Sequence, residues 1–124
     1  MMEQKIFLFG SRAKGTAREH SDWDLLVLFD PVPSLLEFFE KGLELEFWCA
    51  LKRVQEALGK RAILHPFIAV RTKQGYTLVG PNRDEPLEPW LVPDRIPRVW
   101  GTVEEMLRDL GAKNWEEVGD EVGC

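Results

Sequence analysis

The chain has 124 residues, of which 44% are hydrophobic and 30% are charged, a composition typical of one soluble globular domain. Its net charge of −5 does not favour general binding to a nucleic-acid backbone. No apolar run approaches the ~18 residues that a membrane span needs. The N-terminus, MMEQKIFLFG, passes almost directly into a strand pattern without the features of a signal peptide, so we expect a cytoplasmic protein.

The first third of the chain predicts a strand, a turn with a short helix, and a second strand. Residues 5–9, KIFLF, form an apolar run that ends at Gly10, as a buried strand does where it meets a turn. Residues 12–20 can form a short helix, which Gly15 weakens. Residues 23–29, WDLLVLF, form a second buried strand.

A long helix follows. Pro33-Ser34 resembles a helix start, and beyond Gly42 apolar residues recur at spacings of three and four as far as Leu58. The stretch LELEF, residues 43–47, also alternates like a strand. Because the stripe continues unbroken and ends at Gly59, a helix stop signal, we predict a helix here.

The two cysteines have no metal-ligand spacing. We expect Cys49 to be buried within the helical pattern and Cys124, the last residue, to be a free thiol. A disulfide between them is the alternative, which a reducing compartment disfavours.

Two further strands and a proline-rich arm are predicted after the long helix. Residues 62–70 form a third strand, in which Pro66 argues for an edge position or a bulge. Residues 75–80 form a fourth strand, joined to the third through TKQG. From residue 81 to 97 the prolines recur every three to five positions, which indicates an extended arm that stabilises the fold or contacts a partner.

A terminal helix completes the expected elements. Thr102 and Glu105 have the spacing of a capping box, and the helix that they begin should stop at Gly111. Asn114 is a candidate cap for a last turn that contains Trp115. We assign residues 1–80 to the core and residues 81–124 to an arm and helix that pack on or extend the same domain.

Two acids stand at the start of the second strand. Side chains on a strand alternate between faces, so Asp22 and Asp24 should project to the same side. Paired carboxylates repel each other unless a cation neutralises them, and oxygen ligands of this kind suit Mg²⁺ or Mn²⁺. The alternative is that Asp22 caps a turn while Asp24 is solvated at the strand end. Both interpretations stay open on the pair alone.

The turn that precedes the acids offers a second half of a site. Gly10 lets the backbone come close to a ligand, and Ser11 adds a hydroxyl and an N–H at a helix N-terminus, where a phosphate can bind. The alternative is a tight turn with Ser11 as an ordinary N-cap. Gly10 and Gly15 have the spacing of a P-loop, but Thr16-Ala17 follows where Lys-Ser/Thr is required, so this is not a Walker motif.

Taken together, Gly10-Ser11 and the segment Ser21-Asp22-Trp23-Asp24-Leu25 resemble the core signature of the DNA polymerase beta-like nucleotidyltransferases, in the minimal nucleotidyltransferase branch. The likeness extends through about residue 70. It implies an α/β (α+β) fold, a small mixed twisted sheet with helices mainly on one face, here with a proline-rich C-terminal extension. It also implies that Asp22 and Asp24 are catalytic residues that bind Mg²⁺ or Mn²⁺, and that the Gly-Ser turn binds a nucleoside triphosphate.

Three further side chains are candidates for this site. Arg12 and Lys14 either reach the phosphates or form a solvated helix face. In the family, a third carboxylate follows in a segment that resembles Lys-Val-Asp-Leu-Val, whereas this chain has Arg61-Ala62-Ile63-Leu64-His65, with Ile63 at the acid position. His65 lies two residues further on the same strand face, as a substitute catalytic base or as a strand-end histidine without a role. Catalytic activity therefore stays open at this point.

The resemblance implies transfer of a nucleoside monophosphate from a triphosphate to an acceptor hydroxyl. Minimal members of the family often pair with a helical HEPN-domain protein as a toxin–antitoxin system, so a partner protein is a candidate acceptor. The alternative is a catalytically degenerate binding module that keeps the fold. It would act through protein–protein contacts of its proline arm and of its acidic tail, residues 114–124 (NWEEVGDEVGC).

Overall fold

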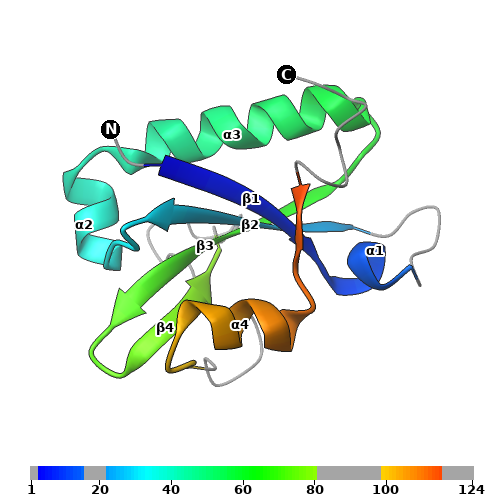
Figure 1. Cartoon of the computed structure of the whole chain (residues 1–124). Helices are drawn as coiled ribbons and strands as arrows, with labels where there is room; N and C mark the ends of the chain where they lie inside the picture. The colour runs from blue at the N-terminus through cyan, green and yellow to red at the C-terminus, as the bar shows by residue number, and fades with distance from the viewer. Residues whose placement is uncertain (1–2, 16–21, 81–98, 116–124) are drawn as a thin grey trace.

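A computed structural model describes residues 3–15, 22–80 and 99–115, with all their side chains except those of Ser11 and Lys14. Five strands form one sheet in the order β4-β3-β2-β1-β5, with α3 along one side of it and α4 on the other (Figure 1). The elements, in chain order, are β1 (Glu3–Phe9), α1 (Gly10–Lys14), β2 (Trp23–Asp30), α2 (Leu35–Glu40), α3 (Leu43–Leu58), β3 (Leu64–Thr72), β4 (Gly75–Val79), α4 (Val103–Leu110) and β5 (Lys113–Asn114).

The sheet is mixed, as predicted. β2 pairs in antiparallel fashion with β1 and in parallel fashion with β3, and β3 forms an antiparallel hairpin with β4. The parallel step from β2 to β3 needs a crossover, which α2 and α3 supply. The α/β fold class expected from the sequence is confirmed, and β2 is the central strand of the sheet.

Both faces of β2 are buried, which explains its continuous apolar sequence. Leu25, Val27 and Phe29 point into the larger core, under α3. Leu26 points to the opposite face, into a smaller cluster that contains Met106 of α4. The α3 stripe predicted from the sequence fills the larger core with Leu43, Phe47, Ala50, Leu51 and Val54. No helix in the described residues is long and apolar enough to cross a membrane.

Cys49 is exposed, so the prediction that it is buried is wrong. The buried positions of α3 include Phe47, Ala50 and Leu51, and Cys49 falls on the opposite side of the helix. Apolar spacing alone did not distinguish the two sides, because Leu45 and Trp48 are also apolar and also exposed.

Pro66 lies in an interior strand rather than in an edge strand, since β3 has β2 on one side and β4 on the other. The β3–β4 ladder begins at Ile68, however, and Pro66, which is paired with Leu25 of β2, lies before its first residue. The missing proline N–H therefore removes no bond from the described β3–β4 ladder.

The C-terminal helix is capped much as predicted. The Thr102 side chain accepts from the Glu105 N–H at 3.1 Å, and α4 ends at Gly111 with a φ of 65°. The Glu105 carboxylate reaches back one residue further than expected, to the Gly101 N–H at 3.3 Å.

The structure adds a strand that the sequence did not predict. Lys113 and Asn114 form β5, where Asn114 pairs with Phe7 of β1 instead of only preceding a turn. Trp115, the next residue, is buried in the larger core. The predicted helix over residues 12–20 begins earlier, at Gly10, and its second half lies outside the described residues, as does the predicted arm over residues 81–97.

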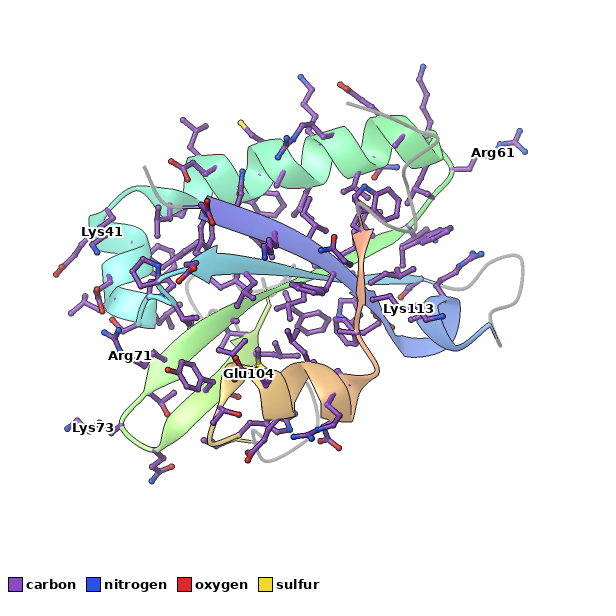
Figure 2. The ribbon with its side chains drawn as sticks, viewed as in Figure 1. Lys41, Arg61, Arg71, Lys73, Glu104 and Lys113 are labelled. Carbon is purple, nitrogen blue, oxygen red and sulfur yellow. The ribbon has the colours of Figure 1, made fainter. Side chains whose placement is uncertain are left out.

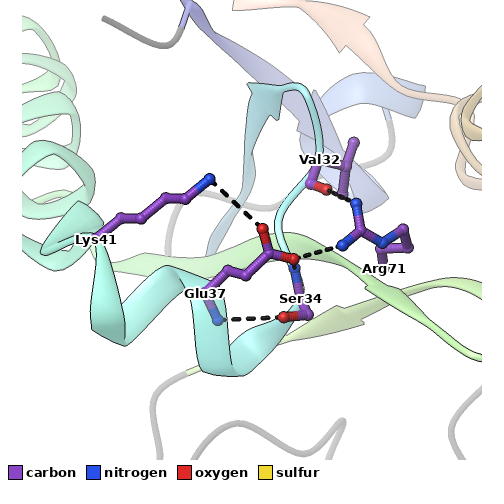
Figure 3. A network of polar contacts seen from close by, with 5 residues as sticks. All are labelled: Val32, Ser34, Glu37, Lys41 and Arg71. Atoms are coloured by element: carbon purple, nitrogen blue, oxygen red, sulfur yellow. Dashed lines mark hydrogen bonds and ion pairs between the residues drawn. The ribbon is translucent and has the colours of Figure 1, made fainter.

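A polar network ties α2 to β3 (Figure 3). Ser34 and Glu37 form a reciprocal capping box, and Arg71 of β3 donates both to the Glu37 carboxylate and to the Val32 carbonyl. Lys41 adds an ion pair at 3.5 Å. The backbone hydrogen bond from Ser34 is the main cause that lowers the pKa of Glu37. Burial opposes it as the next largest effect, and the Ser34 hydroxyl, the Arg71 charge and Lys41 lower the pKa further.

We therefore expect Glu37→Gln to destabilise the protein near neutral pH. Because the folded-state pKa of Glu37 is below its ordinary value of 4.5, its contribution is complete above that value and is lost as the pH falls through the lowered pKa. Urea unfolding of the wild type and the variant at pH 7 and in acid measures the difference. Glu40→Gln, on the same helix, is the control. A difference that persists unchanged in strong acid would contradict the electrostatic origin.

Candidate functional site

The candidate site lies where β1 ends and the starts of β2 and β3 lie beside it. Phe9, the last residue of β1, is opposite Asp24, and Asp24 is opposite His65 of β3. The chain then leaves β1 through Gly10 into α1, at the same end of the sheet (Figure 1). Three segments distant in sequence are thus brought together by strand register alone.

Gly10 and Asp24 are in close contact. The φ of Gly10 is +72°, a conformation that L side chains rarely adopt. A Cβ atom at this position would lie 2.2 Å from Asp24 Oδ2, so no other residue fits without displacing the carboxylate. The structure therefore joins the two halves of the sequence signature, the turn and the acid, in one place.

Asp24 also contacts His65. His65 Nδ1 lies 3.2 Å from Asp24 Oδ1, and the two side chains are 44% and 25% exposed respectively, so both are open to a ligand. The His65 ring packs against other aromatic rings. The His65 and Phe67 ring centroids are 4.6 Å apart, and the Phe67 and Phe9 ring centroids are 5.5 Å apart. The contact fixes Nδ1 of the imidazole and leaves Nε2 for a second partner.

Ile63 lies beside Asp22. The Trp23 N–H donates to the Ile63 carbonyl at 2.8 Å, which extends the parallel β2–β3 pairing by one residue. Alternation along the strands then puts Asp22, Asp24, Ile63 and His65 on one face, as expected from the sequence. Ile63 is 49% exposed, an apolar side chain next to two acids.

The carboxylates of the site fit a cation that takes its remaining ligands from water and substrate phosphates. No group of three or more His, Cys, Asp or Glu side chains in the described residues is arranged to hold a metal ion. Asp22 is exposed and Asp24 partly so, and these two carboxylates are the oxygen donors that the site offers. Mg²⁺ is commonly held by one or two carboxylates together with waters and substrate phosphates, so two acids suffice for that mode.

Arg12 stacks on Trp23. Its guanidinium carbon lies 4.3 Å from the centre of the indole ring. Trp23 is between the two aspartates and so faces the opposite side, where it packs on the larger core. The pair anchors α1 to β2; a contact of Arg12 with phosphates stays a prediction, and the side chains of Ser11 and Lys14 are outside the description. Sequence reasoning missed Trp23, although its place between two acids marked it as inward-facing.

Arg61 precedes β3 and projects from the same end of the molecule that carries α1 (Figure 2). Lys60 and Arg61 are both exposed, and they precede Ile63, whose carbonyl is hydrogen-bonded to the Trp23 N–H between the two acids. Residues 52–61 hold four basic residues and one acidic residue, and this basic stretch ends near the site, which suits an anionic ligand.

Comparison with known proteins agrees with this geometry. The nucleotidyltransferase domain family matches residues 3–79, which include β1 to β4, so the chain belongs to this family. The chain is also similar to protein adenylyltransferase MntA of Thermococcus cleftensis (strain DSM 27260 / KACC 17922 / CL1), with 45% identity over 49 residues. The match covers 40% of this chain and 50% of that protein, so the chain spans about half the length of this curated relative. No solved structure matches the chain.

Gly10→Ala should weaken binding of Mg²⁺ with a nucleoside triphosphate by about 10–100-fold, because the added methyl displaces Asp24. Gly15→Ala is a matched control: Gly15 has a φ of +75°, but a Cβ there meets nothing within 4 Å. Calorimetric titration of both folded variants with ATP and Mg²⁺ measures the difference. Equal affinity of the two variants would mean that the Gly10–Asp24 contact does not serve binding.

Proposed function

We propose that this nucleotidyltransferase is an active, Mg²⁺-dependent enzyme that transfers a nucleoside monophosphate to an acceptor hydroxyl. The observation that carries the proposal is the contact between the Gly10 turn and the Asp24 carboxylate. A turn suited to phosphate and a carboxylate suited to a cation lie side by side, and a nucleoside triphosphate with its cation needs both.

In the proposed reaction the acceptor oxygen attacks the α-phosphorus, the bond to the bridging α–β oxygen breaks, and pyrophosphate leaves. The Gly10-Ser11 backbone would bind the phosphates, with Arg12 and Lys14 as further candidates for contact. Asp22 and Asp24 would hold Mg²⁺ or Mn²⁺, which when bound neutralises charge that develops on the phosphates. Most of the acceleration would come from positioning and preorganised charge.

His65 is the candidate for the acceptor's proton, since the family's acid is replaced by Ile63. Its contact with Asp24 at 3.2 Å orients the imidazole and leaves Nε2 facing away from the carboxylate. In this arrangement the proton passes from the hydroxyl to Nε2 as the new O–P bond forms. The contact supports this assignment, because a carboxylate at Nδ1 orients the imidazole and stabilises the charge that the ring gains with the proton.

The relative's name suggests the finer substrates. By analogy with a protein adenylyltransferase, the donor would be ATP and the acceptor a hydroxyl side chain of a protein. The family resemblance adds a helical HEPN-type partner in a toxin–antitoxin pair, acting in the cytoplasm. These assignments are proposals, because the chain spans only about half of the relative.

A binding module is the second candidate, and the exposed Ile63 favours it. Ile63, an apolar residue beside Asp22, stands at the position where the family's third acid is expected. In that case the fold persists and the protein acts by contact with its partner alone.

The paired change Asp22→Asn with Asp24→Asn should abolish the rise in melting temperature that ATP with Mg²⁺ gives. A ligand at 100 times its Kd stabilises the native state by about 2.7 kcal/mol, which is readily measured by thermal unfolding. Glu40→Gln with Glu44→Gln removes the same charge from α2 and α3 and should leave the rise intact. An equal rise in wild type and the aspartate variant would remove the cation site from the proposal.

Substitutions at residues 63 and 65 distinguish enzyme from binding module. His65→Ala should lower transfer of labelled nucleotide to a candidate partner protein by ~10²–10⁴-fold, the usual loss on removing a general base. Ile63→Asp should increase transfer, and Ile63→Asn controls for polarity without charge. Wild type and Ile63→Asp that are both inert, while the protein still binds its partner, would leave the binding module as the function.

A further inference from the structure

The outer face of α3 carries a stripe of exposed apolar side chains. Leu45 is 72% exposed and Trp48 is 49% exposed, and Cys49 is exposed beside them. With Lys52 they follow the spacing i, i+3, i+4, i+7, so they form one continuous strip along the helix. This face points away from the sheet, on the side of α3 opposite to the core (Figure 1).

Charge is distributed unevenly about this strip. Glu46 lies in the first turn of α3, before the strip's midpoint, whereas Lys52 and Arg53 lie one turn after it. Glu46 and Arg53 are seven residues apart and therefore lie on the same side of the helix. A second α3 in the reversed direction, centred beside Cys49, would set Glu46 opposite the other copy's Lys52 and Arg53, with the two Trp48 side chains close to each other between these contacts.

We propose that α3 pairs with α3 of a second copy of this chain, antiparallel, across a two-fold axis beside Cys49. Glu46 of one copy would then be opposite Lys52 and Arg53 of the other, and the symmetry repeats this contact at the other end. The two Trp48 side chains are buried in the middle, and Leu45 packs against the aliphatic part of the other copy's Lys52. Such an isologous contact is closed, so it yields a dimer and not a fibre.

The surface fits a second copy better than an unrelated helix because its charges complement themselves. Two Glu46 contacts with basic residues form from this one sequence, without any charge supplied by another protein. The pairing also leaves the candidate site open, since Asp24 points to the α4 side of the sheet and α3 covers the other. The proposal is therefore independent of the proposed transfer activity.

A charge exchange tests the pairing. Sedimentation equilibrium of the full-length protein should show dimerisation, and Glu46→Lys, or Lys52→Glu with Arg53→Glu, should each weaken it by about tenfold or more through like-charge repulsion. The variant with all three changes should recover the wild-type affinity, because the complementary pairs are restored with reversed sign. Trp48→Glu should abolish the dimer. Lys73→Glu, on the turn between β3 and β4 (Figure 2), is the matched control.

Cross-linking at Cys49 gives a second readout that does not depend on the charge variants. With a short bismaleimide, Cys124→Ser should form a covalent dimer and Cys49→Ser should not. Thermal unfolding checks that every variant is folded. Any of three results would overturn the proposal: a monomer at every concentration, a charge exchange that fails to restore association, or a wild-type monomer linked internally from Cys49 to Cys124. The last would mean that the chain's own C-terminal segment covers α3.

Discussion

The contact between Gly10 and Asp24 is the constraint on which the candidate site depends. Antiparallel pairing of β1 with β2 puts Phe9 opposite Asp24, so the next residue must turn away directly beside a carboxylate. Only glycine meets both demands of that position, a positive φ and the absence of a Cβ. The turn that begins α1 and the acid on β2 are consequently one structural unit, and a change in either alters the other.

The side chains of β2 alternate between two faces, and this alternation holds Asp24 at the site. Leu25 and its inward-facing neighbours are buried under α3 and fix the strand, while Asp24 on the other face is left beside His65. Trp23, between the two acids, uses the buried direction to stack with Arg12 and so anchors α1. The hydrophobic energy that fixes β2 thus also holds the Asp24 carboxylate in place beside Gly10 and His65.

Local patterns predicted those parts of the fold that local sequence determines. The α3 stripe, β1, β2 and the β3–β4 hairpin follow from periodicity and turn residues, and the acids with the Gly-Ser turn marked the site. The two residues of β5 could not be predicted, because only their pairing with β1 makes them a strand. The exposure of Cys49 could not be predicted without knowing which apolar side of α3 faces the sheet. The contact of His65 with Asp24 needed the parallel register of β2 and β3, which a single sequence does not encode locally.

Ile63 and His65 together reduce the repulsion between negative charges on this face of the sheet. Three carboxylates on adjacent strands would repel one another whenever no cation is bound, and the fold would bear that cost in its ligand-free state. With Ile63 beside Asp22, and an imidazole in contact with Asp24, the repulsion is confined to two acids, one of which is exposed. An apolar residue at this position therefore makes the ligand-free fold less dependent on a bound cation than a third acid would.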